Sequence, residues 1–427
     1  MQADVGEAVH GGWCIARPCD GKAGRRPVLF VRHALPGELI TAVITQTTAK
    51  FARADATEII RAAPERVRPP CPYARPGGCG GCDWQHASLP AQREIKAQVI
   101  RAQLRRIAGI EREVSVQELP GDAAGLGWRT RVRFAVDEDG RAGLYRHRSH
   151  QIEHISDCLI AHPLITEAAV TRQTWSDARW VEVAASPGTG DRALLVADRA
   201  GGGRARRGGR SGGGDAADQQ GADSRPAGSR FLTYRAAGRT WRVSAAGFWQ
   251  GHPGAADVLA EAVLAALEPR PGQQALDLYC GAGLFAGVLA DAVGPAGSVI
   301  GIEQDETAVR DARHNLRETP WAQVHRGDAA RVLARLGLGN AAIAVLDPPR
   351  TGATKALIDV LCSGGLGRVA YVSCDPATLA RDIAVLGGHG WRLDQLHGFD
   401  AFPMTHHVEC LAVLSPAAGG PARTIRR

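Results

Sequence analysis

The chain has 427 residues, a formal net charge of +7 and ten cysteines. That length exceeds what one ordinary hydrophobic core fills, so two or three domains are expected, and the modest positive charge favours polyanionic partners. The sequence shows neither a bilayer-spanning apolar run nor a secretory signal, which argues against membrane and exported classes and predicts a cytoplasmic protein. Its cysteines should then be reduced, so their spacing indicates metal binding or catalysis before disulfides.

The first 65 residues are expected to form a small β-barrel. Short alternating stretches at 26–38, 39–46 and 51–60 are separated by turn residues, among them Pro36 and Gly37. Such a pattern is typical of small barrels of the oligonucleotide-binding kind.

Three cysteines gather in the glycine-rich stretch CPYARPGGCGGCDWQH, which follows the barrel. Cys71, Cys79 and Cys82 have the spacing C-x7-C-x2-C, and Cys158 stands alone downstream. Three clustered thiolates and a distant fourth suit a [4Fe–4S] cube, whose four corners accept ligands at irregular spacing. Structural zinc is the alternative, although zinc ribbons more often carry two separate C-x2-C pairs.

The segment 66–245 mixes helix and strand patterns. Apolar residues at helical spacing predict a helix over 90–110, and GWRTRVRFAVDEDGRAGLYRHR predicts a hairpin that turns at Asp139 and Gly140. One face of the hairpin's first strand would carry three arginines, Arg129, Arg131 and Arg133. That face fits either a solvated surface or the basic footprint of a nucleic-acid binder. Residues 200–229 are glycine-rich and almost free of apolar side chains, so we expect a disordered insertion there.

Strand and helix patterns alternate from about residue 271 to the end of the chain. The expected strands are 274–279, 298–303, 322–326, 342–347, 368–373, 391–400 and 407–414. This alternation is typical of a doubly wound α/β sheet with helices on both faces.

A glycine turn, YCGAG, joins the first of these strands to the first helix, which lets the backbone approach a ligand. Glu303 ends the second strand, where an acid can accept the ribose hydroxyls of an adenosine cofactor. The same spacing also fits dinucleotide cofactors. Asp347, in the DPPRTG loop after the fourth strand, favours S-adenosylmethionine, because methyltransferases that use it commonly carry an acidic Pro-Pro loop there.

A cysteine follows the fifth strand, in the stretch YVSCDPATLARD. Cys374 would lie at the carboxyl edge of the sheet, where open α/β folds bind their ligands, and Pro376 suits the first turn of the next helix. A free cysteine is most often a small buried hydrophobe, but at this edge it can also serve as a nucleophile.

Taken together, these stretches resemble the RNA uracil-5-methyltransferases that carry an N-terminal TRAM domain. The motifs that match occur in the family's order: CPY…GCGGCDWQH, FWQ (248–250), DLYCGAG (277–283), DPPRTG (347–352), SCDP (373–376) and FPMTHHVE (402–409). The resemblance implies an α/β protein in three parts. They are a TRAM or OB-like barrel over 1–65, an α+β RNA-binding region with an iron–sulfur cluster over 66–245, and a Rossmann-like methyltransferase domain over 246–427.

Carried over by position, the resemblance makes Cys374 the nucleophile and Glu409 the base. It also implies an S-adenosylmethionine site formed by five residues, Gln250, Tyr279, Glu303, Asp328 and Asp347. The chain departs from the family at His252, where asparagine is usual, and in the first cysteine spacing, which is longer here. His406 and His407 would point to opposite faces of the last strand, which gives no metal site.

The chemistry of uracil C5 methylation requires these residue types. C5 is a poor nucleophile toward a methyl sulfonium, and a thiolate that adds to C6 turns C5 into an enolate carbon that can attack the methyl group. A base then removes the C5 proton before the thiolate leaves, so one cysteine and one carboxylate suffice. The target base must leave its stack, and Phe248 is either its stacking partner or a core residue.

The sequence therefore predicts a monomeric enzyme that makes 5-methyluridine in RNA through a covalent cysteine–C6 adduct, with 23S ribosomal RNA favoured over transfer RNA. Two alternatives stay open. One is an RNA cytosine-5-methyltransferase, which uses the same thiolate addition. The other is a non-catalytic iron–sulfur protein that binds RNA.

Overall fold

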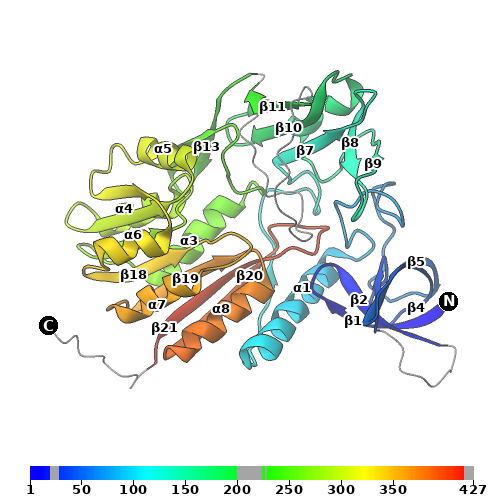
Figure 1. The fold of residues 1–427 in the computed structure, drawn as a ribbon, viewed down its shortest axis with the longest axis horizontal. Helices are drawn as coiled ribbons and strands as arrows, with labels where there is room; N and C mark the ends of the chain where they lie inside the picture. The colour runs from blue at the N-terminus through cyan, green and yellow to red at the C-terminus, as the bar shows by residue number, and fades with distance from the viewer. Residues whose placement is uncertain (20–27, 200–223, 227, 418–427) are drawn as a thin grey trace.

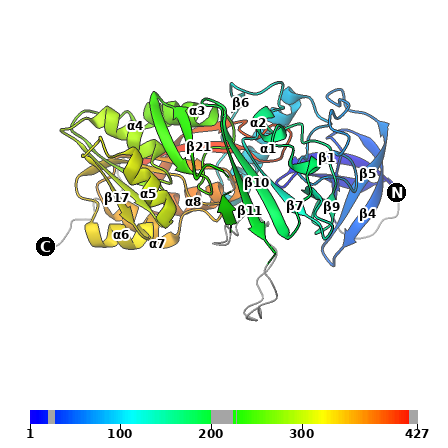
Figure 2. The ribbon, with the colours of Figure 1, turned by 90° about the horizontal axis from the view of Figure 1, so that it is seen from above.

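The computed structural model describes residues 1–19, 28–199, 224–226 and 228–417. Two views show a small barrel at one end of the molecule, a large α/β sheet at the other and a second sheet between them (Figures 1 and 2). Within the described ranges, no helix is both long and apolar enough to cross a membrane.

Five strands close the N-terminal barrel: β1 (Gln2–Val9), β2 (Trp13–Pro18), β3 (Val28–Arg32), β4 (Leu39–Thr47) and β5 (Phe51–Arg61). They pair in the order β1-β2-β3-β5-β4, and β4 returns to β1. Alternate side chains, such as Ala3 and Val5, fill the barrel core. The predicted barrel is confirmed, although its first two strands were not among those identified from the sequence.

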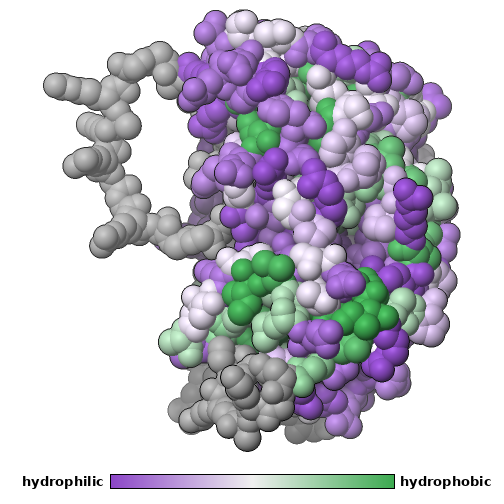
Figure 3. All heavy atoms as spheres, turned by 90° about the vertical axis from the view of Figure 1, so that its right-hand side faces the viewer, coloured by the Kyte–Doolittle hydropathy of each residue, from purple (hydrophilic) through white to green (hydrophobic). Residues whose placement is uncertain are grey.

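The barrel's outer surface carries both polar and apolar side chains. Figure 3 shows this side of the molecule, where hydrophilic residues predominate and a few apolar patches are exposed. Val43 and Ile44 on β4 and Ile60 on β5 are among the exposed apolar residues. Scattered exposure of this kind is ordinary for a folded domain.

A six-stranded sheet occupies the middle of the chain, in the order β12-β11-β10-β7-β8-β9. Its strands are β7 (Arg131–Val136), β8 (Ala142–Tyr145), β9 (Ile152–Glu153), β10 (Ala178–Ser186), β11 (Asp191–Asp198) and β12 (Ser224–Pro226). β7 and β8 form the predicted hairpin. The buried Glu182 on β10 binds Arg131 at 2.6 Å and Arg133 at 2.9 Å, so two of the three arginines brace the sheet.

The insertion expected to be disordered lies mostly outside the described residues. Its segment 224–226 does not follow the prediction, because it pairs with β11 as the edge strand β12. Main-chain hydrogen bonds form this pairing, so the lack of apolar side chains that suggested disorder did not prevent it.

The C-terminal sheet has eight strands in the order β17-β16-β15-β18-β19-β21-β20-β6. Seven of them follow the predicted pattern: β15 (Gln274–Leu278), β16 (Ser298–Glu303), β17 (Ala322–Arg326), β18 (Ala341–Leu346), β19 (Arg368–Ser373), β20 (Trp391–Phe399) and β21 (Glu409–Pro416). The eighth, β6 (Val116–Gln117), comes from the middle of the chain and pairs with β20. β15 to β19 are parallel to one another, whereas β21 is antiparallel to β19 and β20.

Helices cover both faces of this sheet, as a doubly wound fold requires. One apolar core holds residues of α3 (Ala255–Leu267), α4 (Leu284–Val293) and α5 (Glu306–Asn315), together with the hairpin β13 (Phe231–Ala236) and β14 (Arg239–Ser244). The other holds residues of α1 (Leu89–Gln103), α6 (Ala329–Leu336), α7 (Lys355–Ser363) and α8 (Pro376–Gly388). The predicted helix near 90–110 is therefore α1 with its π-helical extension Leu104–Ala108.

The remaining short elements, α2 (Pro163–Thr166) and a 3-10 turn at Val170–Arg172, flank the middle sheet. The division into 1–65, 66–245 and 246–427 stays a prediction. α1, β6 and the β13–β14 hairpin all come from the middle part and pack on the C-terminal sheet.

The expectation for the two adjacent histidines was wrong. β21 begins at Glu409, so His406 and His407 lie in the preceding loop, with ring centroids 4.0 Å apart. A turn in which Thr405 N donates to Phe402 O breaks the extended conformation that would have separated the rings.

Candidate active site at the sheet edge

The topology of the C-terminal sheet brings the predicted nucleophile and base together. Cys374 follows β19, and Glu409 is the first residue of β21, the antiparallel neighbour of β19. Ser373 pairs with Cys410, so the next step of the same register sets Cys374 opposite Glu409. Both side chains therefore lie at the carboxyl edge of the parallel strands.

The same edge holds four of the five predicted cofactor residues, because β15, β16, β17 and β18 are parallel to β19. Each strand delivers one of them at or just beyond its end: Tyr279 after β15, Glu303 on β16, Asp328 after β17 and Asp347 after β18. Open α/β folds bind ligands at this position.

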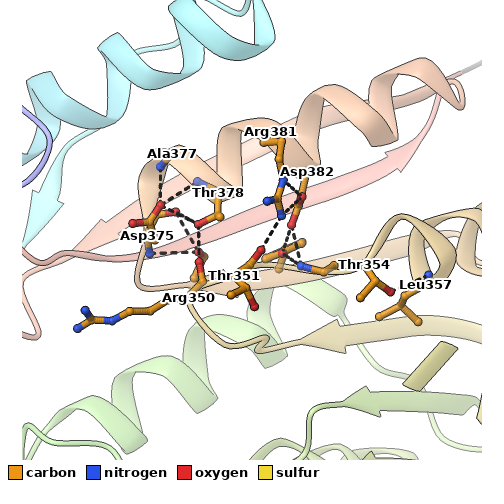
Figure 4. Close-up of polar contacts among 12 residues, drawn as sticks. Arg350, Thr351, Thr354, Leu357, Asp375, Ala377, Thr378, Arg381 and Asp382 are labelled. Carbon is orange, nitrogen blue, oxygen red and sulfur yellow. Dashed lines mark hydrogen bonds and ion pairs between the residues drawn. The ribbon is translucent and has the colours of Figure 1, made fainter. Parts of the chain in front are cut away.

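The helix after Cys374 begins at a well-capped N-terminus. Asp375 is the N-cap residue of α8, and its Oδ1 accepts hydrogen bonds from Ala377 N at 3.0 Å and Thr378 N at 2.8 Å. Pro376 occupies the first turn, as the sequence predicted. Thr378 Oγ1 donates to the carbonyl of Arg350 at 3.1 Å, which ties the helix to the DPPRTG loop (Figure 4).

A buried brace holds that loop a few residues farther on. The fully buried Tyr371 hydroxyl donates to Asp382 Oδ2 at 2.6 Å, and Ala353 N donates to the same oxygen at 2.8 Å. A Cβ atom on Gly352, where φ is +78°, would lie 2.5 Å from this carboxylate, so glycine is required. Figure 4 shows Asp382 and Arg381 reaching from α8 toward the loop. The DPPRTG loop is therefore fixed relative to Cys374.

Electrostatics at the edge favour protonated groups. Burial and the neighbouring Glu409 raise the pKa of the Cys374 thiol to about 12, against an opposing effect of Arg350. Burial, together with the charge of Asp347, raises the pKa of Glu409 well above its ordinary range, and Arg350 again opposes. Strongly shifted groups that share a cleft are typical of catalytic sites.

The glycine turn and the acid at the end of β16 are joined directly. Glu303 accepts a hydrogen bond from Gly281 N at 3.0 Å through Oε2 and one from Asp305 N at 2.8 Å through Oε1. Burial and the charge of Asp328 raise the pKa of the Tyr279 hydroxyl to about 12, which places these two side chains near each other. The structure therefore gathers Tyr279, Glu303 and Asp328 around one turn.

Gln250 lies in the loop between β14 and α3, where its side chain is buried. The next carbonyl, of Gly251, accepts hydrogen bonds from Thr130 N at 2.9 Å and Thr130 Oγ1 at 3.0 Å. His252, the departure from the family pattern, is buried with its ring stacked against Trp128. This histidine therefore packs between the loop and the middle of the chain.

Asp277 is a site residue to which the sequence analysis gave no role. It is buried at the end of β15, its Oδ2 accepts a hydrogen bond from Ala286 N at 2.6 Å, and burial raises its pKa to about 8. The sequence signal that could have identified it is an acidic residue inside an otherwise apolar strand, two residues before the glycine turn. Asp277 therefore joins the end of β15 to the first turn of α4, the two elements that flank the glycine turn.

The four cysteines expected to bind a cluster surround a single pocket. Cys71, Cys79, Cys82 and Cys158 line it together with Tyr73, Gln85, Arg129, Leu144 and Ile155. Among the described residues, no group of three or more His, Cys, Asp or Glu side chains is placed to hold a metal ion. The structure thus brings the four thiols to one pocket without closing them around a single ion.

The cysteine loop is also bound to the loop that leads to Glu409. Asp83, next to Cys82, is buried, and its carboxylate accepts hydrogen bonds from His406 N at 3.0 Å and from Arg32 at 3.2 Å. The ring nitrogen Nδ1 of His406 lies 2.7 Å from the same carboxylate. Lys96 Nζ on α1 donates to Asp400 at 2.6 Å and to the carbonyl of Phe402 at 2.9 Å. The 400–408 loop is therefore positioned by side chains more than 300 residues away in sequence.

Comparisons with known proteins identify the family of the chain. The 23S rRNA (uracil(1939)-C(5))-methyltransferase RlmD of Alkalilimnicola ehrlichii is 32% identical, over 91% of this chain and 92% of that protein. The chain belongs to the RNA uracil-5-methyltransferase family. An uncharacterized RNA methyltransferase of Streptomyces avermitilis is 46% identical, over 98% of this chain and 99% of that protein. As the family's chemistry requires, the methyl donor is S-adenosylmethionine.

Two further comparisons bear on the fold. The sequence model of the tRNA (Uracil-5-)-methyltransferases matches residues 331–416, the part that contains Asp347, Cys374 and Glu409. The structure of Pyrococcus abyssi tRNA (uracil-54, C5)-methyltransferase in complex with S-adenosyl-L-homocysteine has a TM-score of 0.70 and 23% identity, over 97% of this chain and 100% of that one. The barrel and the α/β sheet of this RNA uracil-5-methyltransferase thus have a solved counterpart.

Proposed function

We propose that this protein methylates C5 of a uridine in RNA, with 23S ribosomal RNA as the preferred target, through a covalent bond between Cys374 Sγ and C6. The observation that carries the proposal is the placement of Cys374 opposite Glu409 at the sheet edge where Glu303 and Asp347 also end their strands. The likeness to RlmD supports the choice of ribosomal RNA. We further propose that the protein acts as a monomer in the cytoplasm.

Each of the two residues has one role in this reaction. Cys374 releases its proton to solvent and adds to C6 as the thiolate, and the electron pair of the C5–C6 double bond moves to C5 and the C4 carbonyl as an enolate. C5 then takes the methyl group from the sulfonium, and S-adenosylhomocysteine leaves. Glu409 removes the C5 proton, and the C6–Sγ bond breaks to give 5-methyluridine and the free thiolate.

The shifted pKa values fit these roles. A carboxylate whose pKa is raised by burial is a stronger base once it is ionised, which suits Glu409 for taking a proton from carbon. The positive charge of Arg350 lowers the pKa of Cys374 and so opposes the effect of burial. Within the DPPRTG loop, Arg350 therefore favours the thiolate that the first step needs, whereas the charge of Asp347 opposes it.

The residues of the glycine turn fit an adenosine cofactor. Glu303 accepts hydrogen bonds from three main-chain N–H groups, and Oε2, which accepts only one of them, keeps a lone pair for a ribose hydroxyl. Tyr279, Asp328 and Asp347 follow their strands at the same edge, and Gln250 lies in the loop before α3. We assign all five to S-adenosylmethionine, which supplies the methyl group.

Phe248 provides a surface for the RNA base. Its side chain is 62% exposed, so the core-residue alternative was wrong. It lies two residues before Gln250 in the sequence. An exposed aromatic ring there can stack on a flipped base or its neighbour, worth about 1–3 kcal/mol per base.

Methyl transfer to defined transcripts tests the function. RNA that contains uridine but no cytidine should take up label from S-[methyl-³H]adenosylmethionine as 5-methyluridine, and RNA with cytidine but no uridine should take up none. Label in 5-methylcytidine would favour the cytosine alternative, and the absence of transfer to any RNA would favour the non-catalytic one. In a strain that lacks the gene, 5-methyluridine should be missing from 23S rRNA; its loss from transfer RNA alone would contradict the ribosomal target.

We propose that the four-cysteine pocket holds a [4Fe–4S] cluster. All four side chains are free thiols that face one pocket, and a cube needs four thiolates spread around its corners. Structural zinc stays the alternative, because it also takes four thiolate ligands. The cluster would then clamp the cysteine loop against the middle sheet.

Anaerobically purified protein should contain iron and sulfide at about four each per chain. Cys82→Ser should lose most of the iron and lower the melting temperature, because the loop loses a crosslink. The matched control is Cys362→Ser, on α7, which should keep full iron content. Stoichiometric zinc without iron in the wild type would contradict the cluster.

A further inference from the structure

A histidine of the N-terminal barrel reaches the helix that follows the nucleophile. His10 lies in the turn between β1 and β2, and its Nε2 is 3.1 Å from Asp375 Oδ2. Asp375 is the N-cap residue of α8 and the immediate neighbour of Cys374. The two carboxylate oxygens of Asp375 thus have different partners. Oδ1 accepts hydrogen bonds from the N-terminus of α8, and Oδ2 binds the histidine of the barrel.

The turn that carries His10 is built for close approach to the rest of the molecule. It continues through Gly11 and Gly12, with φ values of +90° and +79° that favour glycine. A Cβ atom on Gly12 would lie 2.8 Å from the carboxyl carbon of Asp83, so the turn packs directly against this buried residue. The same Asp83 fixes His406, whose ring makes an edge-to-face contact with His10 at 6.3 Å.

The environment of His10 favours the neutral imidazole. Burial lowers its pKa, and the nearby charges of His406 and Arg106 lower it further, whereas Asp375 raises it. A neutral ring with its proton on Nε2 donates one hydrogen bond, and the carboxylate of Asp375 is the acceptor within reach. His10 thus acts on Asp375 as a neutral hydrogen-bond donor and not as a positive charge.

Asp375 affects the nucleophile through charge and through position. Its negative charge is one of the causes that raise the pKa of Cys374, and a hydrogen bond to Oδ2 draws part of that charge away from the thiol. The Thr378 hydroxyl lies 2.7 Å from Oδ1 and 3.1 Å from the carbonyl of Arg350, and these two acceptors share its single proton. A continuous chain of contacts therefore joins the barrel, the start of α8 and the DPPRTG loop.

We propose that His10 is a positioning residue for methyl transfer: by holding Asp375, the barrel fixes the start of α8 and directs Cys374 toward C6 of the bound uridine. The barrel would then contribute to the chemical step in addition to any contact with RNA. This inference rests on the proposed function, because it requires Cys374 to be the nucleophile.

The test separates adduct formation from RNA binding. His10→Ala should slow the single-turnover formation of the covalent adduct with 5-fluorouridine RNA by about tenfold, while the Kd for RNA changes by less than about twofold. His10→Gln keeps an N–H donor at a similar reach and should recover most of the rate. His150→Ala, which removes an exposed histidine of the middle region, should react like the wild type.

A double-mutant cycle identifies the partner. Asp375→Asn keeps a good N-cap residue but removes the charge, and in that background His10→Ala should cause little further loss. If the wild type forms no adduct, the proposed function fails. If the wild type reacts and His10→Ala matches its rate, the positioning role is wrong. The role is equally wrong if His10→Ala lowers RNA affinity and rate together and His10→Gln restores neither, since His10 would then only dock the barrel.

Discussion

Cys374→Ala is expected to bind RNA and S-adenosylmethionine yet form neither a covalent adduct nor 5-methyluridine. Without the thiolate, C5 of uracil never gains enolate character, so the methyl group meets a poor nucleophile. The loss of turnover should be at least about 10⁴-fold. Because Cys374 is only partly buried and its neighbours are held by Asp375 and Asp382, the smaller side chain should leave the fold intact. Denaturing electrophoresis of labelled RNA and a filter-binding assay measure the two effects.

Cys362→Ala serves as the matched control, because it removes a thiol from α7 and should leave both adduct and product unchanged. The wild type offers a second test through pH. The pKa of Cys374 is raised to about 12, so the thiolate fraction grows as pH rises. The single-turnover rate of adduct formation should therefore increase about tenfold per unit between about pH 6.5 and about pH 8.5. If Cys374→Ala makes 5-methyluridine, or if the rate of adduct formation does not change with pH, Cys374 is not the nucleophile.

Much of the C-terminal sheet could be predicted from the sequence because its strands are buried on both faces. The centres of these strands, such as VAYV and AIAVL, are continuously apolar, which is the pattern that parallel strands under two helical layers require. β1 has the opposite property: its sequence QADVGEAV alternates around glycine and acidic residues, and closure of the barrel rather than apolar content makes it a strand. β6, with two residues, was too short to leave a pattern.

The site was predictable in its residue types and less so in its geometry. The motifs named Cys374 and Glu409, but their proximity depends on β21 inserting antiparallel between β19 and β20, against the chain order. The contacts of Asp83 with His406 and of His10 with Asp375 join residues more than 300 positions apart. No local pattern encodes such contacts, since each side chain taken alone reads as an ordinary surface group. They come from the docking of the barrel and the cysteine loop on the sheet.

Glu409→Gln is expected to accumulate a protein–RNA adduct that already carries the methyl group. Glutamine keeps the shape and buried position of Glu409 but cannot accept the C5 proton at neutral pH. The first step should not be slowed, because the charge of Glu409 is one of the causes that raise the pKa of Cys374, and the amide removes it. Thiol addition and methyl transfer therefore proceed, and elimination stops.

The adduct distinguishes this arrest from other defects. With ordinary uridine RNA and labelled methyl donor, Glu409→Gln should give a protein–RNA band that survives denaturing electrophoresis and contains the label, whereas the wild type should give free methylated RNA. The wild type should be arrested in the same state on 5-fluorouridine RNA, because a base cannot remove fluorine as a cation. Adding Cys374→Ala to Glu409→Gln should abolish the band, since the adduct needs the thiol. Turnover of Glu409→Gln at the wild-type rate would mean that another group takes the proton, and Asp347, whose charge already affects Glu409, is the carboxylate to replace next.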